Sequence, residues 1–208
     1  MKNLTVVDIP LIKKEISVLR NKDTNEYHFR LALKRITSVL AIEISKKFEL
    51  SEFDVETPLE ITKGYKYKQP IVIVPVLRAG LSMASSFLEI ITEAKVGHIG
   101  LQRDEETLEP IDYYYKTPKD LDISKVIVLD PMLATGGSAA AAVKYLKNRG
   151  ANDCTLACVI AAPEGVKRME EDHPDVPIYT AVLDRQLNEK GYILPGLGDA
   201  GDRTFGTF

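Results

Sequence analysis

Residues 126–138 decide the fold, and they read Val126-Ile127-Val128-Leu129-Asp130-Pro131-Met132-Leu133-Ala134-Thr135-Gly136-Gly137-Ser138. The first four residues are continuously apolar, which is typical of a strand buried on both faces of a parallel sheet. Two glycines and two hydroxyl side chains follow, and residues 138–149 then have the length and composition of a helix. The stretch therefore predicts a strand, a tight loop and a helix, in that order.

The same alternation extends over most of the chain. Residues 71–76 and 155–161 are two further short apolar runs. Segments of helical length at 81–92 and 164–172 follow these runs. Alternating strands and helices predict an α/β fold with an open, mainly parallel sheet, flanked by helices that make right-handed crossovers.

The first third of the chain has a different pattern. Asp8 is placed to cap a first helix that has Pro10 near its start, and apolar residues recur at helical spacing over 29–44. Residues 53–61 alternate between apolar and polar, which indicates an edge strand or a hairpin arm. Because 208 residues suffice for one sizeable core, we expect a single domain over 1–208 with a helical N-terminal segment.

Composition narrows the class of protein. Hydrophobic residues make up 45% and charged residues 27% of the chain, as in ordinary globular proteins. The formal net charge is -3, so the chain lacks the basic excess of a nucleic-acid binder. No apolar run approaches the ~20 residues that cross a bilayer, and the N-terminus shows no signal-like apolar segment. We expect a cytoplasmic protein that binds neither membranes nor nucleic acid.

The cysteines and histidines suggest packing rather than chemistry. Cys154 and Cys158 are four residues apart in a predicted strand, so both thiols point to the same face. Burial is the favoured interpretation, although a redox or metal-binding pair is the alternative. His28, His98 and His173 fall outside the loops that follow the predicted strands and are interpreted as surface or packing residues.

The loop after Leu129 has the properties of a phosphate cradle. Glycines let the backbone approach an anion, Thr135 and Ser138 offer hydroxyl donors, and the helix start adds N–H groups. Asp130 could accept hydrogen bonds from vicinal sugar hydroxyls. The alternative is a plain turn with Ser138 as the N-cap of the helix. The pattern matches neither a Walker loop nor a dinucleotide fingerprint.

Two strings carry a resemblance to a known family. An apolar strand, an acid and Thr-Gly-Gly-Ser together resemble the loop by which type I phosphoribosyltransferases hold phosphoribosyl pyrophosphate. Most of them have a second acid where this chain has Pro131, but Asp-Pro-Met-Leu-Ala-Thr-Gly-Gly-Ser is the form of the uracil branch. Residues 191–203, Gly-Tyr-Ile-Leu-Pro-Gly-Leu-Gly-Asp-Ala-Gly-Asp-Arg, also resemble uracil phosphoribosyltransferases. The resemblance implies the type I phosphoribosyltransferase fold with a flap, or hood.

The resemblance also implies roles for individual residues. Arg78, Arg103 and Asp130 would be catalytic, although Arg78 read alone is an ordinary surface arginine. Residues 105–110 and Tyr113 to Tyr115 resemble the mobile flap, although their composition also suits a solvated loop. The sugar substrate would be bound by Arg78, Arg103, Asp130, Pro131, Met132, Leu133, Ala134, Thr135, Gly136, Gly137, Ser138 and Asp199. Uracil would be bound by Ile193, Gly198, Asp199 and Ala200.

The implied reaction joins uracil to phosphoribosyl pyrophosphate and gives uridine 5′-monophosphate and diphosphate, a step of pyrimidine salvage. The family implies Mg²⁺ held through the sugar substrate and not directly by the protein, a homodimer or higher oligomer, and in some members activation by GTP. The residues name no general base for uracil N1. Two alternatives stay open, a phosphoribosyltransferase for another nucleobase and a pyrimidine regulator that binds RNA or nucleotides.

Overall fold

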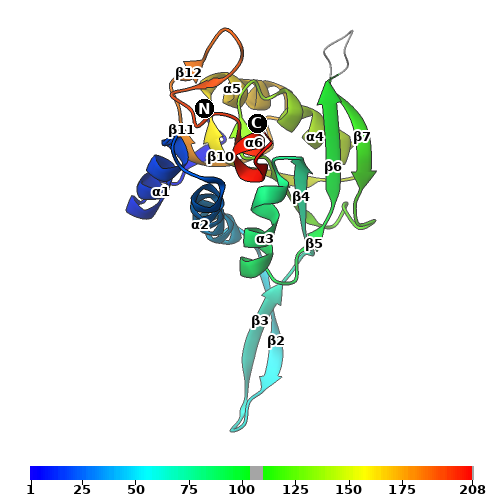
Figure 1. Cartoon of the computed structure of the whole chain (residues 1–208). Coiled ribbons are helices and arrows are strands. Elements are labelled where there is room, and N and C mark those ends of the chain that lie inside the picture. Colours follow the sequence, from blue (N-terminus) through cyan, green and yellow to red (C-terminus); the bar gives the residue numbers. More distant parts are fainter. Residues whose placement is uncertain (104–109, 208) are drawn as a thin grey trace.

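A mainly parallel sheet forms the centre of the molecule, as predicted (Figure 1). The computed structural model describes residues 1–103 and 110–207, without the side chains of 101–103 and 110–113. Among the described residues, every pairing along the main path of the sheet is parallel except β6 with β7. The path runs β1 (Leu4–Val6), β11 (Ile178–Leu183), β10 (Asp153–Ala161), β8 (Lys125–Leu129), β4 (Ile71–Leu77), β6 (His98–Arg103) and β7 (Pro110–Lys116). Two short strands join its sides, β5 (Lys95–Val96) against β4 and β9 (Met132–Leu133) against β10.

Helices cover both faces of the sheet. Ile71 and Ile73 of β4 pack in a core with the helices of one face, whereas Val72 and Val74 pack in a second core on the other. Burying a side chain of this size contributes roughly 1.5–3 kcal/mol to the free energy of unfolding. Because side chains on both faces of β4 are buried, the strand is a continuous apolar run. The first face carries α1 (Pro10–Arg20), α2 (Glu26–Ser45) and α3 (Leu81–Ile90), and the second carries α4 (Gly137–Lys147) and α5 (Pro163–Asp172) (Figure 1).

The N-terminal helices are confirmed, but the predicted cap of the first is wrong. Ile9 is the N-cap of α1 and makes no side-chain capping bond, while Pro10 occupies the first turn as expected. Asp8 lies one residue too early to cap the helix and instead pairs with Lys13, with 2.8 Å between the carboxylate and the ammonium nitrogen. The second helix has a true cap, because the Asn25 side chain accepts a hydrogen bond from the backbone N–H of His28.

Residues 50–67 form the predicted hairpin arm, here called the β-arm. The alternation over 53–61 is not one strand, because β2 (Leu50–Glu56) ends in a turn and β3 (Ile61–Tyr67) returns antiparallel to it. The Thr57 hydroxyl accepts hydrogen bonds from two N–H groups of the turn and closes it. The β-arm extends away from the sheet and helices (Figure 1). Its exposed apolar side chains are Leu50, Phe53, Leu59, Ile61 and Tyr65.

The cysteines are packing residues, as predicted. Cys154 and Cys158 are buried free thiols in the same core, and burial raises their pKa values to about 11 and about 12. His173 is also buried, with its Nε2 atom 2.9 Å from the carbonyl oxygen of Ala140. Within the described ranges, no three histidine, cysteine, aspartate or glutamate side chains group closely enough to hold a metal ion. None of the helices described is both long and apolar enough to traverse a bilayer.

Candidate active site

The carboxyl ends of β4 and β8 meet at one edge of the sheet, where open α/β sheets bind ligands. Residues 130–138 are here called the phosphate loop, and all of them except Pro131 line a first cavity of about 210 Å³. Pro131 is buried and lines neither this cavity nor the next. A second cavity of about 240 Å³ is lined by residues 76–79 and 199–201. Asp130, Met132 and Ser138 line both. The structure thus brings the phosphate loop, Arg78 and Asp199 around adjoining spaces.

The phosphate loop passes directly into α4. Gly136 is the N-cap, with a left-handed φ of 79°, and α4 begins at Gly137. The alternative in which Ser138 caps the helix is therefore wrong, because the helix starts one residue before it. A glycine N-cap has no side chain to bond the first-turn N–H groups, and those groups with the helix dipole favour an anion.

The start of α5 supports the phosphate loop from behind. A Cβ atom on Gly165 would lie 2.4 Å from the carbonyl oxygen of Ala134, and one on Gly136 would lie 2.9 Å from the carbonyl oxygen of Gly165. The two backbones therefore touch without side chains between them. The sequence alone did not predict this role of Gly165. The pattern that could have indicated this close backbone contact is a glycine in the first turn of a helix that follows a buried strand.

Asp130 is a carboxylate with few partners. It follows the last residue of β8, and its Oδ1 atom accepts a hydrogen bond of 3.2 Å from the N–H of Met132. The residue is partly accessible to solvent, but protein surrounds the carboxyl group, and desolvation raises its pKa to about 6 against the smaller, opposite effect of the Met132 N–H. Its unused acceptor sites suit hydroxyl donors of a bound sugar.

Arg78 is exposed, yet it lines the second cavity. Its side chain is 61% accessible, and a guanidinium nitrogen lies 3.5 Å from Oδ1 of Asp202. A second contact reaches the hydroxyl of Thr207 at 3.4 Å. Both contacts are long, so the guanidinium is available to an anionic ligand. The peptide bond that precedes Arg78 is cis.

The flap prediction falls largely outside the described residues. Arg103 ends β6, which pairs with β4, but its side chain lies outside the described part of the chain, as do residues 105–109 and the side chains of Pro110 and Tyr113. Tyr114 is exposed, and the guanidinium of Arg149 lies 4.2 Å from the ring centroid of Tyr115 on β7. The proposed flap role of this segment stays a prediction.

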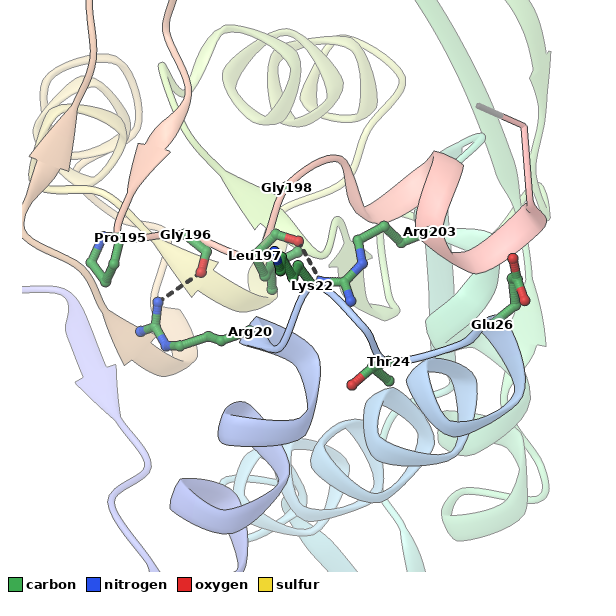
Figure 2. A pocket seen from close by; sticks show the side chains of 9 residues that line it. All are labelled: Arg20, Lys22, Thr24, Glu26, Pro195, Gly196, Leu197, Gly198 and Arg203. Carbon is green, nitrogen blue, oxygen red and sulfur yellow. Dashed lines mark hydrogen bonds between the residues drawn. The ribbon is translucent and has the colours of Figure 1, made fainter.

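Residues 193–200, here called the base loop, connect β13 (Ile193–Leu194) to α6 (Ala200–Phe205). β13 pairs with β12 (Gln186–Leu187), and Asp199 caps α6 by accepting a hydrogen bond of 2.9 Å from the N–H of Asp202. Asp199 and Ala200 line the second cavity. Ile193 is buried and lines neither cavity, and Gly198 lines a third one of about 300 Å³ beside the end of α1 (Figure 2).

The sequence reasoning missed Lys190 and Gly191 as lining residues. Both lie in the turn between β12 and β13 and line the first cavity opposite the phosphate loop. The Asn188 side chain fixes this turn by accepting hydrogen bonds from the N–H groups of Lys190 and Tyr192. The signal was present, because a lysine in a glycine-rich stretch is a candidate for an anion site. The family resemblance assigns the neighbouring residues Ile193 and Gly198 to Ala200 to uracil and gives Lys190 no role.

Comparisons with known proteins agree with this geometry. The model of the family described as uracil phosphoribosyltransferase matches residues 6–207. A uracil phosphoribosyltransferase of Salinibacter ruber is 51% identical over 207 residues, which are 100% of this chain and 99% of the relative. The solved AQ2163 protein of Aquifex aeolicus superposes with a TM-score of 0.92 at 40% identity, covering 98% of each chain.

A more distant structure shows how widely the fold is shared. The adenine phosphoribosyltransferase of Trypanosoma brucei superposes with a TM-score of 0.61 at 16% identity, over 92% of this chain and 88% of that one. The predicted phosphoribosyltransferase fold is therefore confirmed. Because the family model spans residues 6–207 and a relative is 51% identical over 207 residues, the chain belongs to the uracil phosphoribosyltransferase family.

Proposed function

We propose that this chain transfers the phosphoribosyl group of phosphoribosyl pyrophosphate to uracil, in pyrimidine salvage. The bond from C1 of the sugar to diphosphate breaks, a bond from uracil N1 to C1 forms, and the N1 proton is released. The products are uridine 5′-monophosphate and diphosphate. The observation that carries the proposal is the sharing of Asp130, Met132 and Ser138 between the phosphate-loop cavity and the cavity of Arg78 and Asp199.

Each part of the sugar substrate has a partner in this proposal. The phosphate loop and the α4 N-terminus bind the 5-phosphate, and Asp130 accepts hydrogen bonds from the ribose hydroxyls. Arg78 and Arg103 stabilise the charge that develops on the leaving diphosphate, and Asp199 borders the sugar. Lys190 adds a cation beside the 5-phosphate. Positioning and electrostatics then carry the rate without a protein nucleophile.

The base loop recognises uracil through its main chain. Uracil presents two carbonyl acceptors and an imide donor, which the N–H and C=O groups of Ile193 and of Gly198 to Ala200 can match. Cytosine exchanges a donor for an acceptor, so its binding would leave buried polar groups unpaired. Gly198 has a φ of 81°, a conformation that suits glycine and lets the loop turn its main chain toward a ligand.

The residues present fit a Mg²⁺ ion that arrives with the sugar substrate. Asp130 is a carboxylate with unused acceptor sites on the edge of both cavities, but the described residues offer no cluster of protein ligands around it. Substrate phosphates and hydroxyls would therefore supply the coordination, as is common for this ion, and Asp130 would hold the hydroxyls that do so. When bound, Mg²⁺ supplies neutralisation of diphosphate charge.

We also propose a homo-oligomer in which a second copy covers the β-arm. A two-stranded hairpin is marginally stable by itself, and this one leaves Ile61 and Tyr65 70% and 61% exposed. The enzyme would work in the cytoplasm. We include GTP activation in the proposal, as the family resemblance implies it for some members.

The test is formation of uridine 5′-monophosphate from uracil, phosphoribosyl pyrophosphate and Mg²⁺, with and without GTP. Cytosine and hypoxanthine serve as controls. Turnover that depends on uracil supports the proposal, and faster turnover with another base would favour the alternative substrate. If no base reacts although the sugar substrate binds tightly, a regulatory role becomes the better explanation.

A further inference from the structure

The end of α1 is bonded to the base loop through Arg20. One guanidinium nitrogen of Arg20 donates to the carbonyl oxygen of Gly196 at 2.9 Å and to Oδ2 of Asp184 at 2.9 Å. The other donates to Oδ1 of Asp184 at 2.5 Å. Figure 2 shows the Arg20 side chain directed toward Gly196 from the helix end. A single planar group therefore spans a strand end and the middle of the loop.

Asp184 also bonds directly to the base loop. Its side chain is only 3% exposed, and its Oδ2 atom also accepts a hydrogen bond of 2.8 Å from the N–H of Gly196. The N–H and C=O groups of Gly196 are thus both fixed by one ion pair. Gly196 cannot be anchored by a side chain of its own, because it has a φ of 69° and a Cβ there would lie 2.1 Å from the Ile193 carbonyl oxygen.

Arg203 holds the next residue of the base loop in the same way. Its guanidinium donates to the carbonyl oxygen of Leu197 at 2.8 Å, to that of Asn21 at 2.7 Å, and to that of Leu19. The guanidinium carbon lies 4.5 Å from the ring centroid of Phe29. Figure 2 shows Arg20 and Arg203 reaching adjacent positions of the loop. Each arginine makes three hydrogen bonds to protein groups, which leaves it fewer N–H donors for an anion in the third cavity.

We infer that Arg20, Asp184 and Arg203 are positioning residues for uracil. This inference rests on the proposed function. In the proposed function, main-chain groups on both sides of Gly196 and Leu197 bind uracil. The position of these groups is then not set by side chains that contact uracil. The three charged side chains set it instead, through the carbonyl and N–H groups between Ile193 and Gly198. None of the three lines the cavities that contain Asp130, so the sugar substrate depends on them less.

The test is Arg20→Lys, assayed for turnover with each substrate varied in turn. A lysine keeps the charge opposite Asp184 but cannot donate along two edges at once. We expect the KM for uracil to rise at least about tenfold, with the KM for phosphoribosyl pyrophosphate and kcat within about twofold of wild type. Arg35→Lys is the matched control, because Arg35 of α2 pairs at 3.0 Å with the buried Glu15 of α1, and its hydrogen bond goes to that carboxylate and not to the base loop.

The outcomes separate this inference from the proposed function. Suppose that wild type and Arg35→Lys both convert uracil. An unchanged KM for uracil in Arg20→Lys would then overturn only the inference. A joint loss of kcat and of the affinity for both substrates in Arg20→Lys would also overturn only the inference. If wild type converts no uracil, both ideas fail. Should Arg20→Lys not fold, Arg203→Lys takes its place with the same expected split. Failure of both variants to fold would show that these residues serve stability, against the inference.

Discussion

Asp130 illustrates how a site residue costs the fold some stability. Its carboxyl group is enclosed at a strand end, with one backbone N–H as partner, and desolvation raises its pKa to about 6. An acid whose pKa is higher in the folded protein is neutral, and harmless, below the unfolded pKa near 4. Between about pH 4 and pH 6 the unfolded chain loses this proton while the folded protein keeps it. The free energy of unfolding therefore falls over that range.

We predict that Asp130→Asn stabilises the protein while it impairs catalysis. At pH 7–8 the variant should unfold with a free energy about 1–3 kcal/mol above wild type, and the difference should vanish near pH 4. Turnover should fall by roughly a hundredfold or more, because the ribose hydroxyls lose a charged acceptor. Urea unfolding at a series of pH values measures the first effect. A variant less stable than wild type at pH 8 would contradict it.

Arg78 is predicted to matter for catalysis and not for folding. Its side chain is 61% exposed and makes only long contacts, so Arg78→Ala should change the free energy of unfolding by less than about 0.5 kcal/mol. The value of kcat/KM for the sugar substrate should fall by roughly a hundred- to a thousandfold. Steady-state kinetics with Arg78→Lys as an intermediate case provide the check. Near-normal kinetics of the alanine variant would remove Arg78 from the site.

At the scale of elements, the two glycines of the phosphate loop have different tasks. Gly136→Ala should destabilise the protein by about 1–3 kcal/mol, because the residue has a left-handed φ and its Cβ would press on the start of α5. Gly137→Ala should fold normally, since the nearest atom to its Cβ is the Thr135 hydroxyl oxygen at 3.7 Å. That methyl group borders the first cavity, so the KM for the sugar substrate should rise. Thermal unfolding and kinetics of both variants test the distinction, and equal stability would refute it.

The elements that were predicted from sequence are those fixed by local patterns. The apolar runs of β4, β8 and β10 and the helices that follow them can be read from a few consecutive residues. The turn at 57–60 was not predicted, although Pro58 favours a turn, because the alternation of apolar and polar residues continues across it. The hydroxyl of Thr57 closes this turn. The Arg20–Asp184 pair was missed for another reason. Each residue is an ordinary charge in its own neighbourhood, and 164 residues of chain separate them.

At the scale of the whole molecule, the β-arm predicts an association that can be broken selectively. Ile61 and Tyr65 are two residues apart from Lys63 on β3, so both point to the same face of the β-arm. Replacing Ile61 and Tyr65 together by lysine should shift the sedimentation coefficient toward that of a monomer at micromolar concentration. Tyr27→Lys replaces an equally exposed aromatic side chain outside the β-arm, on α2, and should leave the assembly unchanged. Identical sedimentation of wild type and the double variant would contradict the proposed interface.

The link from α1 to the base loop also bears on how the protein folds. Arg20 and Gly196 are 176 residues apart along the chain, and Arg203 and Asn21 are 182 apart. Contacts between such distant segments close large loops, whose entropy must be overcome before the contacts stabilise anything. The sheet and its helices can form earlier. In refolding experiments, uracil-dependent activity should therefore return more slowly than the helical circular dichroism signal, because the hydrogen bonds of Arg20 and Arg203 form last.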